Sequence, residues 1–188
     1  TGASAGSGRA SALALAARGA TLTVLSRNAE KLADLGRELR SVGATEAHVL
    51  VADLEDRNAL QRQVDLHLAA AGPIHILVNN AGGPPGGPIL EATEADFIQA
   101  FGRLLMAPHL LVKLLLPGMK AAGYGRIVNI ISTSVREPLP NLGVSNTIRA
   151  ATAAWAKTLS KELPPGITIN NVLPGATATE RLEAIERA

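Results

Sequence analysis

The chain has 188 residues, of which 47% are hydrophobic and 18% are charged. This length matches a single domain, and the hydrophobic content excludes an intrinsically disordered chain. The formal net charge of +2 does not favour binding to nucleic acid, and the absence of cysteine excludes disulfides and thiolate chemistry. We therefore expect one compact domain in a reducing cytoplasm.

Short runs of β-branched residues alternate with longer helical patterns along the whole chain. Parallel strands buried on both faces are predicted at residues 21–26, 47–52, 74–79, 127–131 and 167–172. Crossover helices are predicted at residues 8–17, 29–42, 56–71, 93–121 and 144–163. This order is typical of an α/β fold with a Rossmann-like, doubly wound parallel sheet flanked by helices.

Prolines and glycines interrupt two of these segments. Pro108 removes an amide donor and is expected to kink or divide the longest helix, and Pro117 is expected to mark its end. Residues 82–88, with the sequence GGPPGGP, are expected to form an exposed loop after a strand. No run of 18 apolar residues occurs, so no membrane span is predicted.

A glycine-rich turn, TGASAGSG, leads directly into the first predicted helix. Such a turn lets the backbone amides at a helix N-terminus approach a pyrophosphate, which favours a dinucleotide ligand. The candidate contacts in this turn are Gly2, Ser4, Gly6, Ser7 and Gly8.

The same turn also matches G-x-S-x-G, the motif that exposes a nucleophilic serine in α/β hydrolases. Ser4 would then need a histidine on a loop, whereas all four histidines lie in predicted strands or helices. Gly8 has no role in a nucleophile turn but suits close packing around a phosphate. The dinucleotide is therefore the favoured ligand.

The end of the strand at residues 21–26 indicates which dinucleotide is bound. This strand end lies beside the adenosine ribose in a dinucleotide fold, and no Asp or Glu stands there to hold a bare 2′-hydroxyl. Ser26, Arg27 and Asn28 can instead donate hydrogen bonds to a 2′-phosphate. The sequence thus favours NADP(H) over NAD(H), with Arg9 as a weaker second candidate for this phosphate contact.

Four motifs, in order and correctly spaced, resemble the short-chain dehydrogenases/reductases over essentially the whole chain, and in particular the 3-oxoacyl-carrier-protein reductases. They are the glycine turn at residues 1–8, an acid in the sequence ADL at residues 52–54, NNAG at residues 79–82, and Pro-Gly at residues 174–175 with Thr177 and Thr179 nearby. The resemblance implies that cofactor contacts also come from Asp53, Leu54, Asn80, Ala81, Gly82, Arg149, Pro174, Gly175 and Thr177.

The catalytic positions of this family are altered in the chain. The family uses a serine, a tyrosine thirteen residues later and a lysine four residues after that. Ser132 keeps the serine, but Ser145 replaces the tyrosine, Arg149 replaces the lysine, and Leu104 aligns with the family's helix asparagine. Serine is a far weaker acid than a phenol and arginine cannot shuttle protons, so proton transfer is expected to be impaired or rerouted. The sole tyrosine, Tyr124, lies in a glycine turn and is expected to be structural.

The leading hypothesis is an NADP(H)-dependent oxidoreductase that interconverts a small carbonyl compound, such as a 3-oxoacyl thioester, and a secondary alcohol, with Ser132, Ser145 and Arg149 as its catalytic residues. The alternative is a catalytically silent NADP(H)-binding sensor or scaffold. No metal is expected. The replacement of tyrosine and lysine leaves both hypotheses open.

Residues 100–116 and 150–156 are apolar on more than one face. The resemblance implies a homodimer or homotetramer through these helices, and deep burial of a crossover helix explains the pattern equally well. The chain begins on a turn and stops in a helix-like charged stretch. We therefore expect a single dinucleotide-binding domain over residues 1–188 that lacks its first strand and its C-terminal portion.

Overall fold

The structure is a computed structural model that describes residues 1–177. The chain divides into two compact units, Thr1–Val64 and Asp65–Ala188, each of which is described by itself. Thr179 lies outside the described residues.

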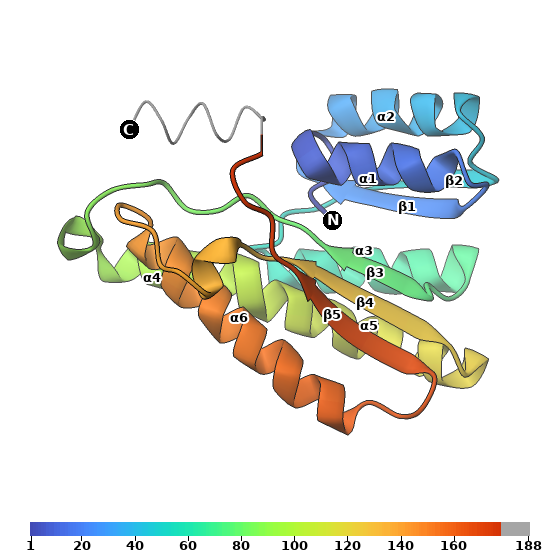
Figure 1. The fold of residues 1–188 in the computed structure, drawn as a ribbon. Coiled ribbons are helices and arrows are strands. Elements are labelled where there is room, and N and C mark those ends of the chain that lie inside the picture. Colours follow the sequence, from blue (N-terminus) through green and yellow to red (C-terminus); the bar gives the residue numbers. More distant parts are fainter. Residues whose placement is uncertain (178–188) are drawn as a thin grey trace. The chain divides into compact units, whose positions relative to one another are not determined.

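The first unit contains a two-stranded parallel sheet and its connecting helices (Figure 1). Its elements are α1 (Gly6–Ala16), β1 (Thr21–Ser26), α2 (Ala29–Ser41) and β2 (Glu46–Val51), and α3 (Arg57–Ala71) begins here and continues into the second unit. Strands β1 and β2 pair from Thr21 opposite Glu46 to Ser26 opposite Val51.

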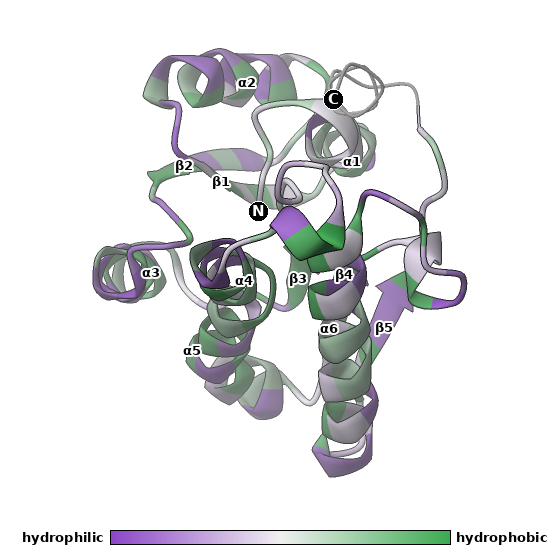
Figure 2. Cartoon of the chain, turned by 90° about the vertical axis from the view of Figure 1, so that its left-hand side faces the viewer, coloured by the Kyte–Doolittle hydropathy of each residue, from purple (hydrophilic) through white to green (hydrophobic). Residues whose placement is uncertain are grey.

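Helix α2 forms because its ends and its apolar face are both well specified. The Asn28 side chain caps its N-terminus by accepting a hydrogen bond from the Lys31 amide at 2.8 Å. Leu32, Leu35 and Leu39 recur at helical spacing and are buried in a cluster with residues of α1 and β1. Figure 2 shows the resulting mixture of hydrophobic and hydrophilic residues along this helix.

The second unit contains a three-stranded parallel sheet in the order β3-β4-β5 (Figure 1). The strands are β3 (Ile76–Asn79), β4 (Gly125–Ile130) and β5 (Ile167–Val172). The helical elements are η1 (Ile89–Glu91), α4 (Glu94–Phe101), the π-helix η2 (Gly102–Met106), α5 (Ala107–Ala122), η3 (Thr133–Val135) and α6 (Gly143–Glu162). Helices α5 and α6 lie on the same side of this sheet (Figures 1 and 2).

Most predicted elements are confirmed within two residues at each end. Burial on both faces is confirmed at the end of β1, where Val24, Leu25 and Ser26 are all buried, and is wrong for β5. In β5, Ile167 and Ile169 are buried whereas Thr168 and Asn170 are exposed. The two long helices of the second unit lie on the same side of the sheet, so β5 alternates between a core-facing and an exposed residue.

The two prolines of the long helical segment behave differently. The π-helix directly before Pro108 divides α4 from α5, which confirms the predicted interruption. The prediction that Pro117 ends the helix is wrong: α5 continues to Ala122 and ends at Gly123, whose φ of 62° suits a helix C-cap. Pro117 removes only the amide donor to the carbonyl of Lys113, an exposed residue.

The helical stretch Glu94–Ala122 is long and apolar enough to cross a membrane by length and composition alone. A buried core helix passes the same test, and α5 packs against β4, with Met119 beside Gly125 and fully buried.

Candidate functional site

The glycine turn of the first unit has the geometry of an anion site. Gly2 and Gly6 have φ values of 58° and 52°, which glycine adopts without strain. Ala5 precedes α1 and provides no side-chain cap, and the first turn of α1 contains no acidic residue. The N-cap residue thus gives α1 no side-chain hydrogen bond, and the partial positive charge at this helix N-terminus favours a negatively charged ligand.

The carboxyl end of β1 lies beside this turn, because the Ala3 amide donates to the Leu25 carbonyl at 3.3 Å. Ser26 is only 8% exposed, and its Oγ has no hydrogen-bond partner among the described residues. A buried hydroxyl without a partner is uncommon, and a bound ligand would satisfy it.

Arg27 follows Ser26 and is largely exposed. Its Nη1 lies 3.8 Å from Oδ2 of Asp53, and 69% of its side chain is accessible to solvent. The other oxygen of Asp53 accepts the Glu55 amide at 2.9 Å, which fixes the carboxylate at the end of β2. An exposed pair of this kind contributes little to stability, so Arg27 is able to turn toward an anionic ligand.

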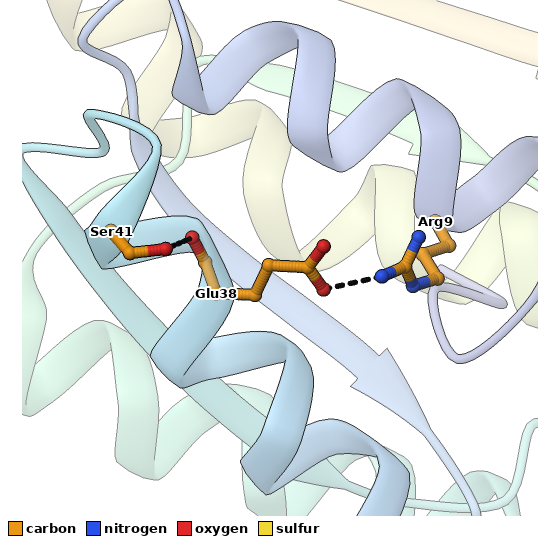
Figure 3. Close-up of polar contacts among 3 residues, drawn as sticks. All are labelled: Arg9, Glu38 and Ser41. Carbon is orange, nitrogen blue, oxygen red and sulfur yellow. Dashed lines mark hydrogen bonds and ion pairs between the residues drawn. The ribbon is translucent and has the colours of Figure 1, made fainter.

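Two other candidates in the first unit are already engaged. The side-chain oxygen of Asn28, Oδ1, caps α2, which leaves the side-chain nitrogen, Nδ2, as the donor for a ligand. Arg9 forms an ion pair with Glu38 of α2, as Figure 3 shows. Arg9 would have to leave this ion pair to contact a phosphate, so it stays the weaker of the two candidates. Leu54 directly follows Asp53 and is half-buried.

The second unit carries a row of three asparagines across its sheet. Asn79, Asn129 and Asn171 are in register on β3, β4 and β5. The amide of Asn79 donates to Asn129 at 2.9 Å, and the amide of Asn129 donates to Asn171 at 3.0 Å. The sequence analysis missed this row because only the strand register places the three positions together.

The residues after β3 lead toward the start of α6. Ala81 packs against a buried cluster that includes Leu104 and Ile148, whereas Asn80 is half-buried and Gly82 is exposed. The Gly87 amide donates to the Asn141 carbonyl at 2.8 Å. The predicted loop at residues 82–88 is thus confirmed, and it is joined to the turn before α6.

Ser132 and the Pro-Gly element meet at the carboxyl ends of β4 and β5. Ser132 Oγ accepts the Ser134 amide at 3.1 Å and so caps η3. The next amide, of Thr133, donates to the Pro174 carbonyl at 3.0 Å, and Thr177 Oγ1 donates to the Gly175 carbonyl at 3.2 Å.

Ser145 and Arg149 form a hydrogen-bonded pair on α6. The Arg149 Nε donates to Ser145 Oγ at 3.2 Å, and its Nη1 donates at 3.1 Å to the carbonyls of Ile130 and Ile131. These carbonyls directly precede Ser132, so the structure brings the three predicted catalytic residues to one end of β4. Ser145 is 7% exposed.

This pair has a defined chemical capacity. Arg149 donates a hydrogen bond to the Ser145 oxygen, so the hydroxyl proton of Ser145 is directed to another acceptor. A guanidinium stays protonated in proteins and therefore polarises the hydroxyl without exchanging a proton itself. The pair can donate a hydrogen bond to a carbonyl oxygen, but it lacks the acidity of a phenol.

Tyr124 lies at the opposite end of β4 from Ser132. The strand has six residues, so its ends are about 20 Å apart. The Tyr124 ring instead contacts the Arg126 guanidinium, with the guanidinium carbon 4.3 Å from the ring centroid. Tyr124 is therefore a structural residue of the strand start.

The hydrolase and metal alternatives find no support in the described residues. Over residues 1–177, no histidine hydrogen-bonds to Ser4, and no group of three His, Asp or Glu side chains could hold a metal ion. His48 pairs with Glu46, and His109 accepts a hydrogen bond from Trp155.

Comparisons with known proteins agree with this geometry. The model of the short chain dehydrogenase family matches residues 1–188. A putative ketoacyl reductase of the granaticin polyketide synthase from Streptomyces violaceoruber is 33% identical over 98% of this chain and 69% of its own length. Across four relatives, two of them uncharacterized oxidoreductases and two ketoacyl reductases, the chain spans 61% to 74% of the relative's length.

Solved structures show the same fold with both cofactors. A 7 alpha-hydroxysteroid dehydrogenase complexed with NADH and a 7-oxo bile acid has a TM-score of 0.91 and 29% identity, covering 98% of this chain and 72% of that protein. An L-sorbose reductase from Gluconobacter frateurii complexed with NADPH and L-sorbose has a TM-score of 0.90 and 30% identity, covering 95% and 68%.

Proposed function

Since the chain belongs to the short-chain dehydrogenase family of oxidoreductases, we propose that it is an NADP(H)-dependent enzyme that interconverts a carbonyl compound and a secondary alcohol. The observation that carries this proposal is the preserved dinucleotide geometry of the first unit together with the polar Ser132, Ser145 and Arg149 group of the second. A 3-oxoacyl thioester is the substrate class we favour, in line with the ketoacyl reductase among the relatives.

The residues of the first unit suit the adenosine and phosphate parts of the cofactor. Amides at the α1 N-terminus would hold the pyrophosphate, and the Asp53 carboxylate would accept from the adenine amino group. The unpartnered Ser26 hydroxyl and the exposed Arg27 guanidinium would bind a 2′-phosphate. When bound, the nicotinamide would supply or accept the hydride.

The residues of the second unit would act on the substrate oxygen. Ser145, oriented by Arg149, would donate a hydrogen bond to the carbonyl oxygen and stabilise the negative charge that develops there. Ser132 would contribute a second hydroxyl, and the proton would come from water. Arg149 would also donate to ribose hydroxyls, while Asn80, Ala81, Gly82, Pro174, Gly175 and Thr177 would line the nicotinamide side.

Titration of the protein with NADPH and NADH in parallel tests the cofactor part of the proposal. We expect NADPH to bind more tightly, and we expect Arg27→Ala to weaken NADPH binding by about 10-fold to 100-fold while leaving NADH unchanged. Arg18→Ala, another exposed arginine whose guanidinium donates to the Ala14 carbonyl, is the matched control. Equal affinity for the two cofactors in the unmodified protein would contradict the NADP(H) preference.

A silent NADP(H)-binding sensor or scaffold is the second candidate, because Arg149 is engaged by backbone carbonyls and cannot relay protons. The double exchange Ser145→Tyr with Arg149→Lys separates the two functions. A large gain in carbonyl reduction would indicate a decayed site, whereas loss of an existing activity would indicate a specialised one.

We also propose a homo-oligomer that forms through α4, α5 and α6, in the reducing cytoplasm. Ile98 and Phe101 of α4 are 62% and 42% exposed, which supports an apolar contact on that helix. The absence of cysteine supports the compartment. Analytical ultracentrifugation would test the oligomer, and a monomer at micromolar concentration would contradict it.

A further inference from the structure

The carbonyl of Leu104 lies in a buried, irregular part of the long helical segment. Leu104 belongs to the π-helix η2, in which a carbonyl accepts the amide of residue i+5 rather than i+4, and the residue is only 6% exposed. A donor from another helix to this carbonyl would tie η2 to its neighbour.

Thr152 of α6 supplies such a donor. Its Oγ1 lies 2.9 Å from the Ile148 carbonyl of its own helix and 3.2 Å from the Leu104 carbonyl, so its one proton is shared between the two acceptors, and the residue is 2% exposed. A buried apolar cluster that includes Leu104 and Ile148 surrounds this contact. The hydroxyl is thus the polar link between α6 and η2 inside an otherwise apolar packing surface.

Thr152 also lies on the helix face that carries the candidate site. Ser145, Arg149 and Thr152 stand at positions i, i+4 and i+7, which share one side of an α-helix. Arg149 ties this face to the end of β4, and Thr152, one turn further along, ties it to η2. Two contacts one turn apart fix both the rotation and the axial position of α6.

We propose that Thr152 is a positioning residue for the Ser145–Arg149 pair, and that its hydrogen bond to the Leu104 carbonyl holds α6 in the register at which Arg149 reaches β4. This inference deepens the proposed function and rests on it.

Two variants test this role. Thr152→Val keeps the shape but removes the donor, and Thr152→Ser keeps the hydroxyl. We expect Thr152→Val to lower kcat for carbonyl reduction by about 10-fold to 100-fold with the Kd of NADPH unchanged, and Thr152→Ser to restore kcat.

The packing of α6 provides the control for both variants. Trp155, the single tryptophan, lies on α6 and donates to His109 of α5 at 3.3 Å. Its emission spectrum therefore reports whether α5 and α6 still pack together in each variant.

A spectroscopic measurement separates this inference from the proposed function. The Arg149 Nε–H donates to Ser145, so its NMR signal, assigned by its loss in Arg149→Lys, reports the pair without any turnover. We expect this signal to shift or broaden in Thr152→Val and to remain in Thr152→Ser. An unchanged signal in folded Thr152→Val would overturn the positioning role whether or not the protein is active. A perturbed signal in a protein that reduces no carbonyl would keep the positioning role and overturn the function.

Discussion

The two units hold their candidate residues in different ways. In the first unit, the N-cap residue of α1 provides no side-chain cap, the Ser26 hydroxyl has no partner within residues 1–177, and Arg27 is 69% exposed. In the second unit, Ser145 and Arg149 are already hydrogen-bonded to each other and to the backbone. The first arrangement leaves polar groups available to a ligand, whereas the second is built before any ligand arrives. Substitutions in the first unit should therefore change affinity, and those in the second should change turnover or stability.

Removal of the Ser145 hydroxyl is expected to have the largest effect. Loss of a preorganised hydrogen-bond donor to a developing negative charge typically lowers the rate by about 10²-fold to 10³-fold, so Ser145→Ala should reduce kcat by that order with the Kd of NADPH unchanged. Ser160→Ala, an exposed serine on the same helix that bonds only to the Lys157 carbonyl, is the control. Full activity in Ser145→Ala would show that this hydroxyl takes no part in the reaction.

Arg149→Met should lower stability as well as activity. The substitution removes a charged donor from the carbonyls of Ile130 and Ile131, and such hydrogen bonds contribute about 1.5–3 kcal/mol. We expect the free energy of unfolding in urea to fall by about 3 kcal/mol. The exposed Arg27→Met should change it by less than about 0.5 kcal/mol. Similar losses for the two variants would erase the contrast between the units.

The pH-dependent contribution of the α4 N-terminus to the stability of the protein should be smaller than the effect of Arg149→Met. Hydrogen bonds from the Thr93 side chain and backbone lower the pKa of Asp96 from its ordinary value. A lowered pKa means that this carboxylate stabilises the folded state above the unfolded-state pKa of about 4, and that the contribution is lost as the pH falls through the lowered value. The difference in Tm between the protein and Asp96→Asn should therefore be present at pH 6 and shrink below about pH 4. A difference that grows on acidification would be inconsistent with this cap.

Tyr124→Phe should have the smallest effect. The phenol lies at the far end of β4 from Ser132, so kcat should stay within about twofold of the unmodified protein. A steady-state assay with NADPH checks this expectation. A loss comparable to that of Ser145→Ala would place the tyrosine in the reaction and contradict the site described here.

The sequence was sufficient where a local pattern determines the structure. The β-branched runs and the interruption at Pro108 each depend on residues close in the chain, and both are found in the structure. Pro117 was misjudged because a helix tolerates one missing amide whose acceptor is exposed. The burial of β5 was misjudged because it depends on where distant helices pack.

The sequence predicted which residues form the candidate site, but it did not predict the hydrogen bonds that hold them. Ser132, Ser145 and Arg149 follow from motif spacing, and the structure brings them to one strand end. The contact between Thr152 and Leu104 joins residues 48 positions apart, and the row of asparagines depends on the register of three strands. No local signal encodes either feature, because both arise from tertiary packing.

The most direct test of the central claim is the transfer of hydrogen from cofactor to substrate. The protein would be incubated with NADPH deuterated at its transferable position and with a 3-oxoacyl thioester, a 7-oxo steroid and a ketose, and the products would be analysed by mass spectrometry. We predict an alcohol that carries deuterium at the former carbonyl carbon, formed faster from NADPH than from NADH. Tight binding of NADPH without deuterium transfer to any of these compounds would contradict the enzyme and favour the sensor.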